Sequence, residues 1–513
     1  MISEATINLG VVGATCLLLV IYFIKFVYSY KHQYESNPLC TFSVMFCLLV
    51  VLLVTFILPI DIFLVSFAKN HDGTFKDWAT NETLSKVDKF MYDTYYSLYG
   101  LSITLMFIVI PFLHFFNDET DSSSSGRLHT AIKITFGATL FMIALIFAGS
   151  YTYSQNLGPN DIFKNILPYQ KEDKIQNGIV FVLTLITTMG FVNVCFYTAS
   201  GIFSWPIGLL LGTKEIKSRY NIVNDRADLL RLQVSNLRQK SRAEGLSDRE
   251  QEKLTSAEAE LAQLDHEATV LSEQSSSWSH KLRIIIRPVQ ILFGAIFVIL
   301  SIILLITLIT VDVDRILHSN GPKEGYVLLK PVLPNALEYV FTKTQDLILI
   351  GPIPLLIIVC FLAVATISGI RNLGLWFLLT RLYRVKPGRT PPRALLFFCI
   401  TVMLTALAFN LLLYSMASQY ITFGNQNYVA KSANGTMSVQ PCTVADYNKD
   451  CLLTRSSVIL MRMMSNLWLF GAMFYWSSWI FVAIGTVSFI AYLYRGRRQA
   501  AHDLILDDDD FED

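Results

Sequence analysis

Charged side chains are scarce in this sequence, and their scarcity indicates the class of protein. Only 16% of the 513 residues are charged, whereas 53% are hydrophobic, and the mean hydropathy is +0.46. Ordinary soluble domains do not reach these values. The 41 basic and 40 acidic residues nearly cancel, to a net charge of +1, so no bulk field favours nucleic acid as a partner. The sequence predicts a polytopic membrane protein.

Motifs for catalysis and metal binding are also missing. The sequence has no Cys-x-x-Cys spacing, no Walker A loop and no His-Glu-x-x-His pattern, which are common signatures of zinc and nucleotide sites. No group of residues indicates a catalytic constellation. We therefore expect no enzyme activity, no metal and no tightly bound cofactor. A primary pump is excluded unless a partner supplies ATP hydrolysis.

Long apolar runs are what the sequence does contain. A hydrocarbon core about 30 Å thick needs roughly 20 apolar residues of helix, and these runs are too long for barrel strands. The predicted fold is all-α, with nine transmembrane helices. The nine runs are approximately 7–28, 39–67, 95–116, 131–150, 178–211, 288–310, 347–370, 394–417 and 457–494.

The charges beside the first run predict the orientation. Its start has no basic region and no small-residue cleavage site, so the run is interpreted as a retained anchor. Lys25 and Lys31 follow the anchor, whereas Glu4 precedes it. By the positive-inside rule the N-terminus is luminal, and nine spans then place the C-terminus in the cytosol.

Two features of the predicted luminal loops agree with this topology. The Asn-x-Ser/Thr triplets at Asn81 and Asn434 both lie in luminal loops, where they are expected to carry glycans. Cys442 and Cys451 lie together in the last luminal loop and are expected to form a disulfide in that oxidising compartment, with a free pair as the alternative. The other six cysteines lie in apolar spans, where a thiol usually acts as a small hydrophobe.

Four parts of the chain follow from this pattern. Residues 1–211 hold spans one to five, 212–287 form a soluble cytosolic insertion, 288–494 hold spans six to nine, and 495–513 form an acidic tail expected to be disordered. In the insertion, two heptad seams separated by Gly245 predict an antiparallel helical hairpin. The seams are Val223, Ala227, Leu230, Val234 and Leu237, then Leu254, Ala257, Leu261, Leu264, Ala268 and Leu271.

The role of the hairpin stays open at this point. A spacer or a rod for homodimerisation and a docking arm for another protein fit the seams equally well. At its base, Tyr220 to Val223 has the Tyr-x-x-apolar form of an endocytic sorting signal, which would engage a clathrin adaptor complex. The alternative is that Val223 only completes the first seam.

A basic and aromatic stretch follows the seventh span. Residues 368–396 read SGIRNLGLWFLLTRLYRVKPGRTPPRALL, a mixture that suits a helix lying in the membrane interface with its basic tips on anionic lipid. Ordinary positive-inside anchoring is the alternative. The basic residues of this predicted cytosolic interface are Arg371, Arg381, Arg384, Lys386, Arg389 and Arg393.

One acid lies inside an apolar run. Asp61 is about 22 residues into the second run, near its predicted luminal end, and Pro59 just before it is expected to bend or end the helix. The apolar residues after it would then fold back along the membrane surface. On one interpretation, Asp61 caps backbone amides freed by that break. On the other, it titrates in an acidic lumen and acts as a proton-linked gate or partner switch.

Three strings resemble a known family closely. Residues 58–79 (LPIDIFLVSFAKNHDGTFKDWA), the stretch 368–396 and residues 418–428 (SQYITFGNQNY) are similar to the cobalamin-transport members of the limb-region-type membrane protein family. The resemblance runs from the first span to the ninth. It implies a protein of the lysosomal membrane, with a further pool at the plasma membrane, that is needed to bring cobalamin to the cytosol.

The resemblance also implies partners. They are an ABC half-transporter of the D subfamily and the cytosolic cobalamin-processing chaperone, with cobalamin as a transported ligand. An endocytic adaptor role towards the insulin receptor, or a role like that of a lipocalin receptor without transport, is the alternative function. The spans show few polar groups beyond Asp61, His114, Asn193 and Asn410, which favours an escort of the ABC partner over a path for a large amphipathic ligand.

Overall fold

The computed structural model describes most of the chain. The described residues are 4–31, 37–117, 124–155, 174–211, 214–243, 251, 254, 257–258, 261, 264, 278–328, 331–345, 353–377, 380–383, 385, 390–431, 437–444, 448–465 and 468–509.

Within these residues, nine helices are long and apolar enough to cross a membrane, which confirms the predicted all-α membrane fold. Each of the nine overlaps one predicted run. They are α1 (Glu4–Tyr30), α2 (Pro38–Phe67), α3 to α4 (Asn81–Thr104 and Ile110–Phe116, joined by the π-helical turn Leu105–Val109), α5 (Ser124–Gln155), α6 to α7 (Lys174–Asn193 and Ala199–Leu211, joined by the π-helical turn Val194–Thr198), α10 (Trp278–His318), α12 (Ile353–Leu373), α13 (Pro392–Met416) and α16 (Trp468–Asp509).

Further elements lie between these helices. They are α8 (Lys214–Ala243), the 3-10 turn Pro322–Glu324, α11 (Ala336–Gln345), α14 (Ser418–Phe423), α15 (Arg455–Ser465), and two antiparallel hairpins, β1 (Leu375–Phe377) with β2 (Thr380–Tyr383) and β3 (Asn427–Lys431) with β4 (Met437–Pro441).

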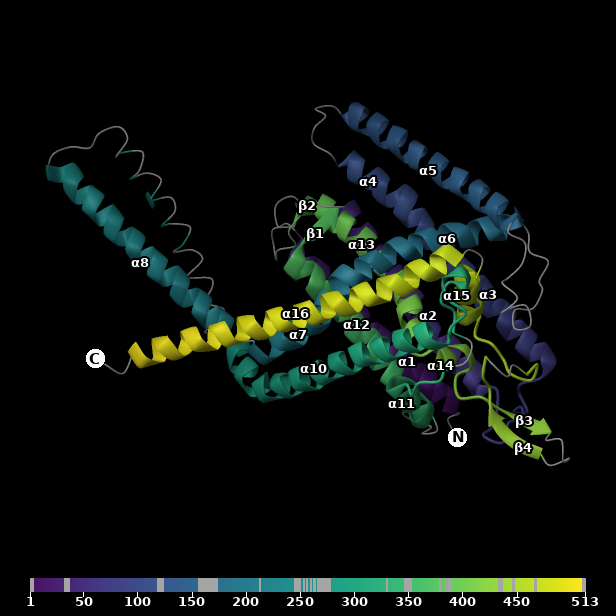
Figure 1. Cartoon of the computed structure of the whole chain (residues 1–513). Helices are drawn as coiled ribbons and strands as arrows, with labels where there is room; N and C mark the ends of the chain where they lie inside the picture. The colour runs from purple at the N-terminus through teal and green to yellow at the C-terminus, as the bar shows by residue number, and fades with distance from the viewer. Residues whose placement is uncertain are drawn as a thin grey trace. The chain divides into compact units, whose positions relative to one another are not determined.

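The chain forms two compact units. The first unit is Met1–Ser204 with Leu300–Ala491, and the second is Trp205–Ile299 with Tyr492–Asp513. In the first unit α13 packs against α2 and α6, while α5 lies alongside α4 and α6 (Figure 1). Nearly every residue of α13 is buried, so α13 is at the centre of this helical bundle.

Glycines let the helices of the first unit approach one another closely. A Cβ at Gly201 of α7 would lie 1.8 Å from the carbonyl oxygen of Ala365 in α12. A Cβ at Gly190 of α6 would lie 2.1 Å from the carbonyl oxygen of Leu404 in α13. Small residues of this kind bring backbones together where no hydrophobic effect drives helices to associate. The centre of the bundle is therefore tightly closed.

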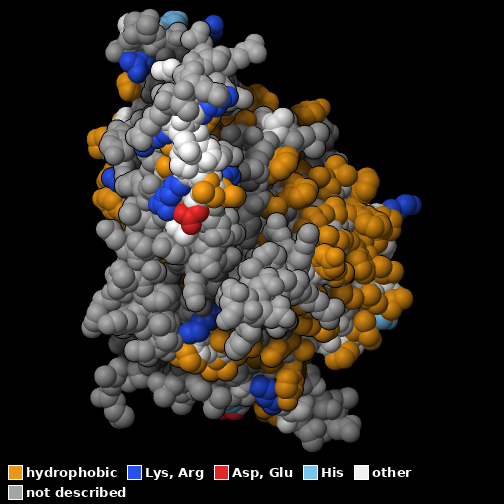
Figure 2. Space-filling model, turned by 90° about the vertical axis from the view of Figure 1, so that its left-hand side faces the viewer, with side chains coloured by type: hydrophobic (Ala, Val, Ile, Leu, Met, Phe, Trp, Pro, Cys, Tyr) orange, Lys and Arg blue, Asp and Glu red, His pale blue; other side chains and the backbone are white. Residues whose placement is uncertain are grey.

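Large apolar side chains remain exposed on the outer helices. In α5, Phe136, Phe147 and Tyr151 are 64%, 71% and 67% exposed. Figure 2 shows a broad area of hydrophobic side chains, with few charges among them, on one face of the molecule. A soluble protein rarely exposes so much apolar surface, whereas lipid covers it in a membrane protein.

The structure corrects two expectations about the spans. Helix α2 continues through Pro59 to Phe67 and neither ends nor folds back, because Leu58 and Ile62 on either side of the proline are packed in the bundle. The ninth run is two helices, since α15 ends at Ser465 and α16 begins at Trp468.

Two further differences concern polar segments. The basic stretch after α12 is not an interfacial helix: Gly374, at φ +81°, follows the last residue of α12, and the aromatic and β-branched residues beyond it form the β1–β2 hairpin. The predicted disordered tail is helical as far as Asp509. Its first half contains good helix formers such as Arg497, Gln499 and Ala500, and these extend α16.

The second unit contains the predicted arm. Ala227 and Val234, members of the first seam, are 1% and 6% exposed. The described positions of the second seam, from Leu254 to Leu264, are helical. Arg238, near the end of α8, forms an ion pair of 2.8 Å with Glu258, which precedes the seam positions Leu261 and Leu264. The end of α8 therefore lies beside an early part of the second seam, as in an antiparallel pair.

Candidate functional site

Several of the polar side chains that interact over long distances lie where the spans of the first unit are connected. We call the segments 68–80, 319–345 and 417–465, so far as they are described, the end layer. Thr454 links two parts of it, because its backbone amide donates to the carbonyl of Thr422 at 3.0 Å and its hydroxyl donates to the carbonyl of Ile421 at 2.7 Å.

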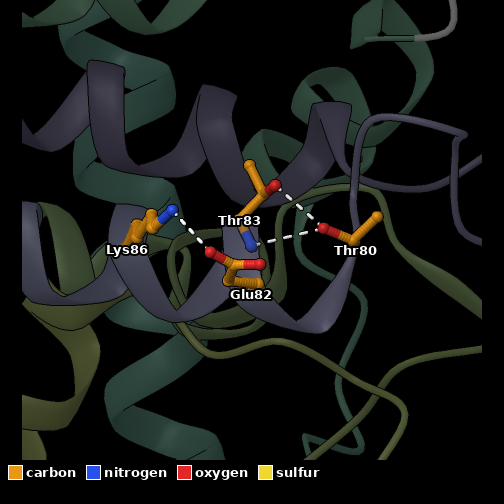
Figure 3. A network of polar contacts seen from close by, with 4 residues as sticks. All are labelled: Thr80, Glu82, Thr83 and Lys86. Carbon is orange, nitrogen blue, oxygen red and sulfur yellow. Dashed lines mark hydrogen bonds and ion pairs between the residues drawn. The ribbon is translucent and has the colours of Figure 1, made fainter.

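The first predicted glycosylation site is at the start of α3. Figure 3 shows the Thr80 hydroxyl beside Thr83, whose backbone amide donates to it at 3.3 Å, and the ion pair of Lys86 with Glu82 at 2.7 Å. This is an N-cap followed by a charge pair one turn on. Asn81, next to the cap, is exposed. The second predicted site, Asn434, lies outside the described residues.

A disulfide joins Cys442 to Cys451, with Cα atoms 5.9 Å apart. Gln426 anchors the segment between them: its side-chain oxygen accepts from the amide of Leu452 at 3.0 Å, and its backbone carbonyl accepts from the amide of Cys442 at 2.9 Å. The β3–β4 hairpin leads from Gln426 to Cys442 (Figure 1). One buried amide side chain and one disulfide therefore hold both ends of this loop.

Asp61 caps a helix that lies far away in the sequence. Its carboxylate is 2% exposed. The atom Oδ2 accepts from the backbone amide of Ser456, in the first turn of α15, at 2.9 Å, and from the hydroxyl of Tyr95 at 3.2 Å. An acid at a helix N-terminus satisfies free amides and interacts favourably with the helix dipole. The capped amide therefore belongs to α15, whereas the sequence pointed to amides freed at Pro59.

Arginine fixes the same end of α15 from outside. Arg455 forms a bidentate pair with Asp88 of α3, with Nε 2.9 Å from Oδ1 and a second, shorter contact from NH2 to Oδ2. Its guanidinium also lies 5.3 Å from the ring centroid of Tyr92. Fork-shaped pairing of this kind fixes orientation as well as distance. Helix α15 is thus held by α2 and α3 together.

A second acid holds the corner between α13 and α14. The side-chain oxygen Oε1 of Glu338 accepts from the backbone amide of Tyr420 at 3.0 Å, and Asn335 donates to the carbonyl of Met416 at 2.5 Å. Burial raises the pKa of the Glu338 carboxyl, while the amides of Tyr420 and Gln419 act against that rise. Helix α11 therefore binds the last carbonyl of one helix and the first amides of the next.

A third acid, Asp312 near the end of α10, was not singled out from the sequence. It is completely buried, and Ser478 of α16 donates to its Oδ2 at 2.6 Å. The predicted sixth span ends at residue 310, two residues before this acid. The pattern Asp-x-Asp-Arg at 312–315, directly after an apolar run, was the available signal.

The other predicted site residues are not brought to the end layer. Tyr220 and Val223 lie within helix α8, which belongs to the second unit. Arg371 is exposed in the last turn of α12, Arg381 lies in β2, and Arg393 is half-buried at the start of α13. Arg384, Lys386 and Arg389 lie outside the described residues.

In the described part of the chain, no three His, Cys, Asp or Glu side chains come together in a group that could hold a metal ion. Carboxylates bind helix ends in the end layer and so join them to other helices. Combined with the nine spans, the end layer defines a multi-pass helical membrane protein whose polar groups fix helix ends.

Comparison with known proteins assigns the family. The family profile described as LMBR1-like membrane protein matches residues 8–283, more than half of the chain, so the chain belongs to this family. This agrees with the resemblance seen in the sequence. No solved structure matches.

Curated relatives match along the whole chain. A protein of Gallus gallus named lysosomal cobalamin transport escort protein LMBD1 is 30% identical, over 99% of this chain and 97% of its own length. The protein of the same name from Bos taurus is 29% identical, over 100% of this chain and 97% of its own. A protein of Nematostella vectensis named probable lysosomal cobalamin transporter is 29% identical, over 97% and 95%.

Proposed function

We propose that this protein acts in the export of cobalamin from the lysosome as an escort of an ABC half-transporter of the D subfamily. The names and full-length similarity of the relatives support a role in lysosomal cobalamin transport. In this proposal the protein is a transport escort and not an enzyme. The ABC partner would supply the ATP hydrolysis for which this sequence has no motif.

The close packing of the helical bundle favours the escort role over a cobalamin path through the protein. Between α1, α2, α12 and α13 there is a small hollow of about 20 Å³ lined by apolar side chains and three threonines. The threonines Thr55, Thr366 and Thr405 each donate to a carbonyl of their own helix. A large amphipathic corrinoid needs a wide polar route, so this hollow does not suit cobalamin.

The proposal also assigns sides of the membrane. The end layer would face the lumen, because it contains the disulfide and its first segment leads directly into Asn81, and the α8 arm would face the cytosol. There the arm would be available to the cobalamin-processing chaperone. A plasma-membrane pool would use the helical Tyr220 to Val223 segment to engage a clathrin adaptor.

Reconstitution separates the escort from a path. Liposomes loaded with cobalamin and containing this protein alone should retain it, whereas liposomes that also contain the ABC partner should release it when ATP is added. Release by this protein alone would overturn the proposal. In cells, loss of this protein should reduce the amount of the ABC partner in lysosomes.

A variant that fills the hollow gives a second readout. Ala363→Phe places a large side chain in it, at a typical cost of about 1–3 kcal/mol for overpacking. The matched control is Ile357→Phe, at a position of α12 that is 46% exposed. An escort predicts that both variants support export equally once they are delivered to lysosomes in equal amounts. Loss of export in Ala363→Phe alone would favour a path through the bundle.

A further inference from the structure

Asp312 joins two helices of the first unit that are remote in sequence. It lies in the last two turns of α10, and its hydrogen-bond partner Ser478 lies 166 residues later, in α16. Its side chain has no exposed surface. An ionisable group buried in a membrane-spanning helix is costly and usually functional.

The carboxylate of Asp312 is only partly satisfied. Ser478 donates to Oδ2 at 2.6 Å, but among the described residues Oδ1 has no hydrogen-bond partner. The guanidinium of Arg315 lies 3.8 Å from Oδ1, which is too far for a hydrogen bond. A buried charge is tolerated when it is paired and fully hydrogen-bonded, and Asp312 meets this condition only in part.

Asp61 provides the contrast within the same molecule. Its burial is similar, but one of its oxygens receives both a backbone amide at a helix start and a tyrosine hydroxyl. Those donors, together with the dipole of α15, stabilise an ionised carboxylate. Among the described residues, Asp312 receives one hydrogen bond, from a neutral hydroxyl. Asp312 is therefore the less fully hydrogen-bonded of the two buried acids.

The groups around Asp312 come from four segments. Arg315 is on its own helix, and Tyr475 of α16 lies within electrostatic reach of both. Tyr326, in the loop after α10, stacks on Tyr475 with ring centroids 4.2 Å apart. Tyr414 of α13 lies near Arg315 and Glu338. Asp314, two residues on, is already bound by His318 at 2.7 Å and by the amide of Val332 at 2.9 Å.

Among the described residues, Arg315 is thus the cation that lies beside this carboxyl group, which is short of donors. Binding a proton to Asp312 would remove the uncompensated charge and leave the Ser478 hydroxyl as a neutral hydrogen-bond partner. It would also release Arg315 from its ion pair. Proton binding therefore changes the strength of the contact between α10 and α16.

We propose that Asp312 is a proton-binding site that couples the contact between α10 and α16 to the pH of the surrounding compartment. In neutral conditions the carboxylate pairs with Arg315, and on acidification it binds one proton and the pair is lost. The ligand is the proton itself, and no metal or organic cofactor is required. The proposal goes beyond the escort function, because it concerns the purified protein alone and needs neither cobalamin nor a partner.

Infrared difference spectroscopy tests the site directly. The purified full-length protein is shifted between about pH 7.5 and 4.5, a range that includes the titration of perturbed carboxyl groups. The expected result is a carbonyl band of a protonated carboxyl group that disappears in Asp312→Asn and persists in the matched control Asp61→Asn. A spectrum without such a band, or a band unchanged in Asp312→Asn, overturns the proposal.

A second variant keeps the test decisive if Asp312→Asn does not fold. Ser478→Ala leaves the carboxyl in place and removes its only hydroxyl donor, so the band should shift in frequency and appear at a different pH. A band that is unaltered in Ser478→Ala contradicts the assignment to Asp312.

Thermal scanning adds a readout that a merely structural ion pair would not give. If the folded protein binds the proton more tightly than the unfolded chain, proton binding at this site stabilises the folded protein, and the melting temperature rises as pH falls. Asp312→Asn should flatten that part of the pH dependence, whereas Asp61→Asn should leave it. An equal loss of melting temperature at every pH would show that Asp312 is only a structural partner of Arg315.

Discussion

Replacing Asp61 with alanine should destabilise the protein through the start of α15. The change leaves two buried donors, the Ser456 amide and the Tyr95 hydroxyl, without their acceptor. An unsatisfied buried donor costs about 1–3 kcal/mol, so two of them cost about 2–6 kcal/mol. Asp61→Asn retains one acceptor oxygen, which can still accept from both donors, and should therefore cost less than Asp61→Ala.

Thermal scanning of the full-length protein in detergent is the assay. Asp61→Ala should lower the melting temperature more than Asp61→Asn, and a matched control, Asp93→Ala at an exposed position of α3, should change it little. Tyr95→Phe removes one of the two donors, so its effect should be smaller in the Asp61→Ala background than alone. A melting temperature for Asp61→Ala equal to that of Asp93→Ala would refute the cap.

The same variants address the alternative role of Asp61 as a proton-linked switch. A purely structural cap predicts that Asp61→Asn supports cobalamin release with unchanged pH dependence once the protein reaches lysosomes. Loss of release with normal amount and delivery would instead support the switch.

Three further outcomes are expected. Changing both Asn81 and Asn434 to Gln should abolish any mobility shift on endoglycosidase treatment, and a surviving shift would contradict the topology. Leu261→Pro should make the α8 arm sensitive to protease in the full-length protein while membrane insertion stays intact, because proline in a helix interior costs about 3 kcal/mol; an arm that stays resistant would argue against the hairpin. Burial raises the pKa of Glu338, so its contribution to stability is full at low pH and is lost as pH rises through the folded-state value. The melting temperature of Glu338→Gln, relative to that of the native protein, should therefore rise between about pH 4 and pH 7. A difference between the two melting temperatures that stays constant over this range would disprove this.

The sequence predicts the spans and the arm because both depend on local patterns. A run of about 20 apolar residues is required to cross a bilayer, and each of the nine runs contains a helix. The seam residues Ala227 and Val234 follow a heptad spacing that only needs a neighbouring helix to be buried. For these elements the information lies within about 30 residues of sequence.

The long-range partners of the buried acids could not be predicted in this way. Asp61 binds a residue 395 positions away, Asp312 one 166 positions away and Glu338 one 82 positions away. Nothing in the local pattern of an acid identifies a backbone amide in another helix. Pro59 was misjudged for a related reason, because packing on both sides of α2 overrides the local tendency of proline to break a helix.

The bond between Asp61 and Ser456 has a consequence for biosynthesis. At about 5–20 residues per second, the 395 residues that separate the two take about 20–80 s to synthesise. During that time α2 is already made, while its acid has no amide from α15 to bind. A nascent chain that stops before Arg455 keeps this acid uncapped in the membrane. Such truncated chains should be recognised and degraded in the endoplasmic reticulum even when all their earlier spans are inserted.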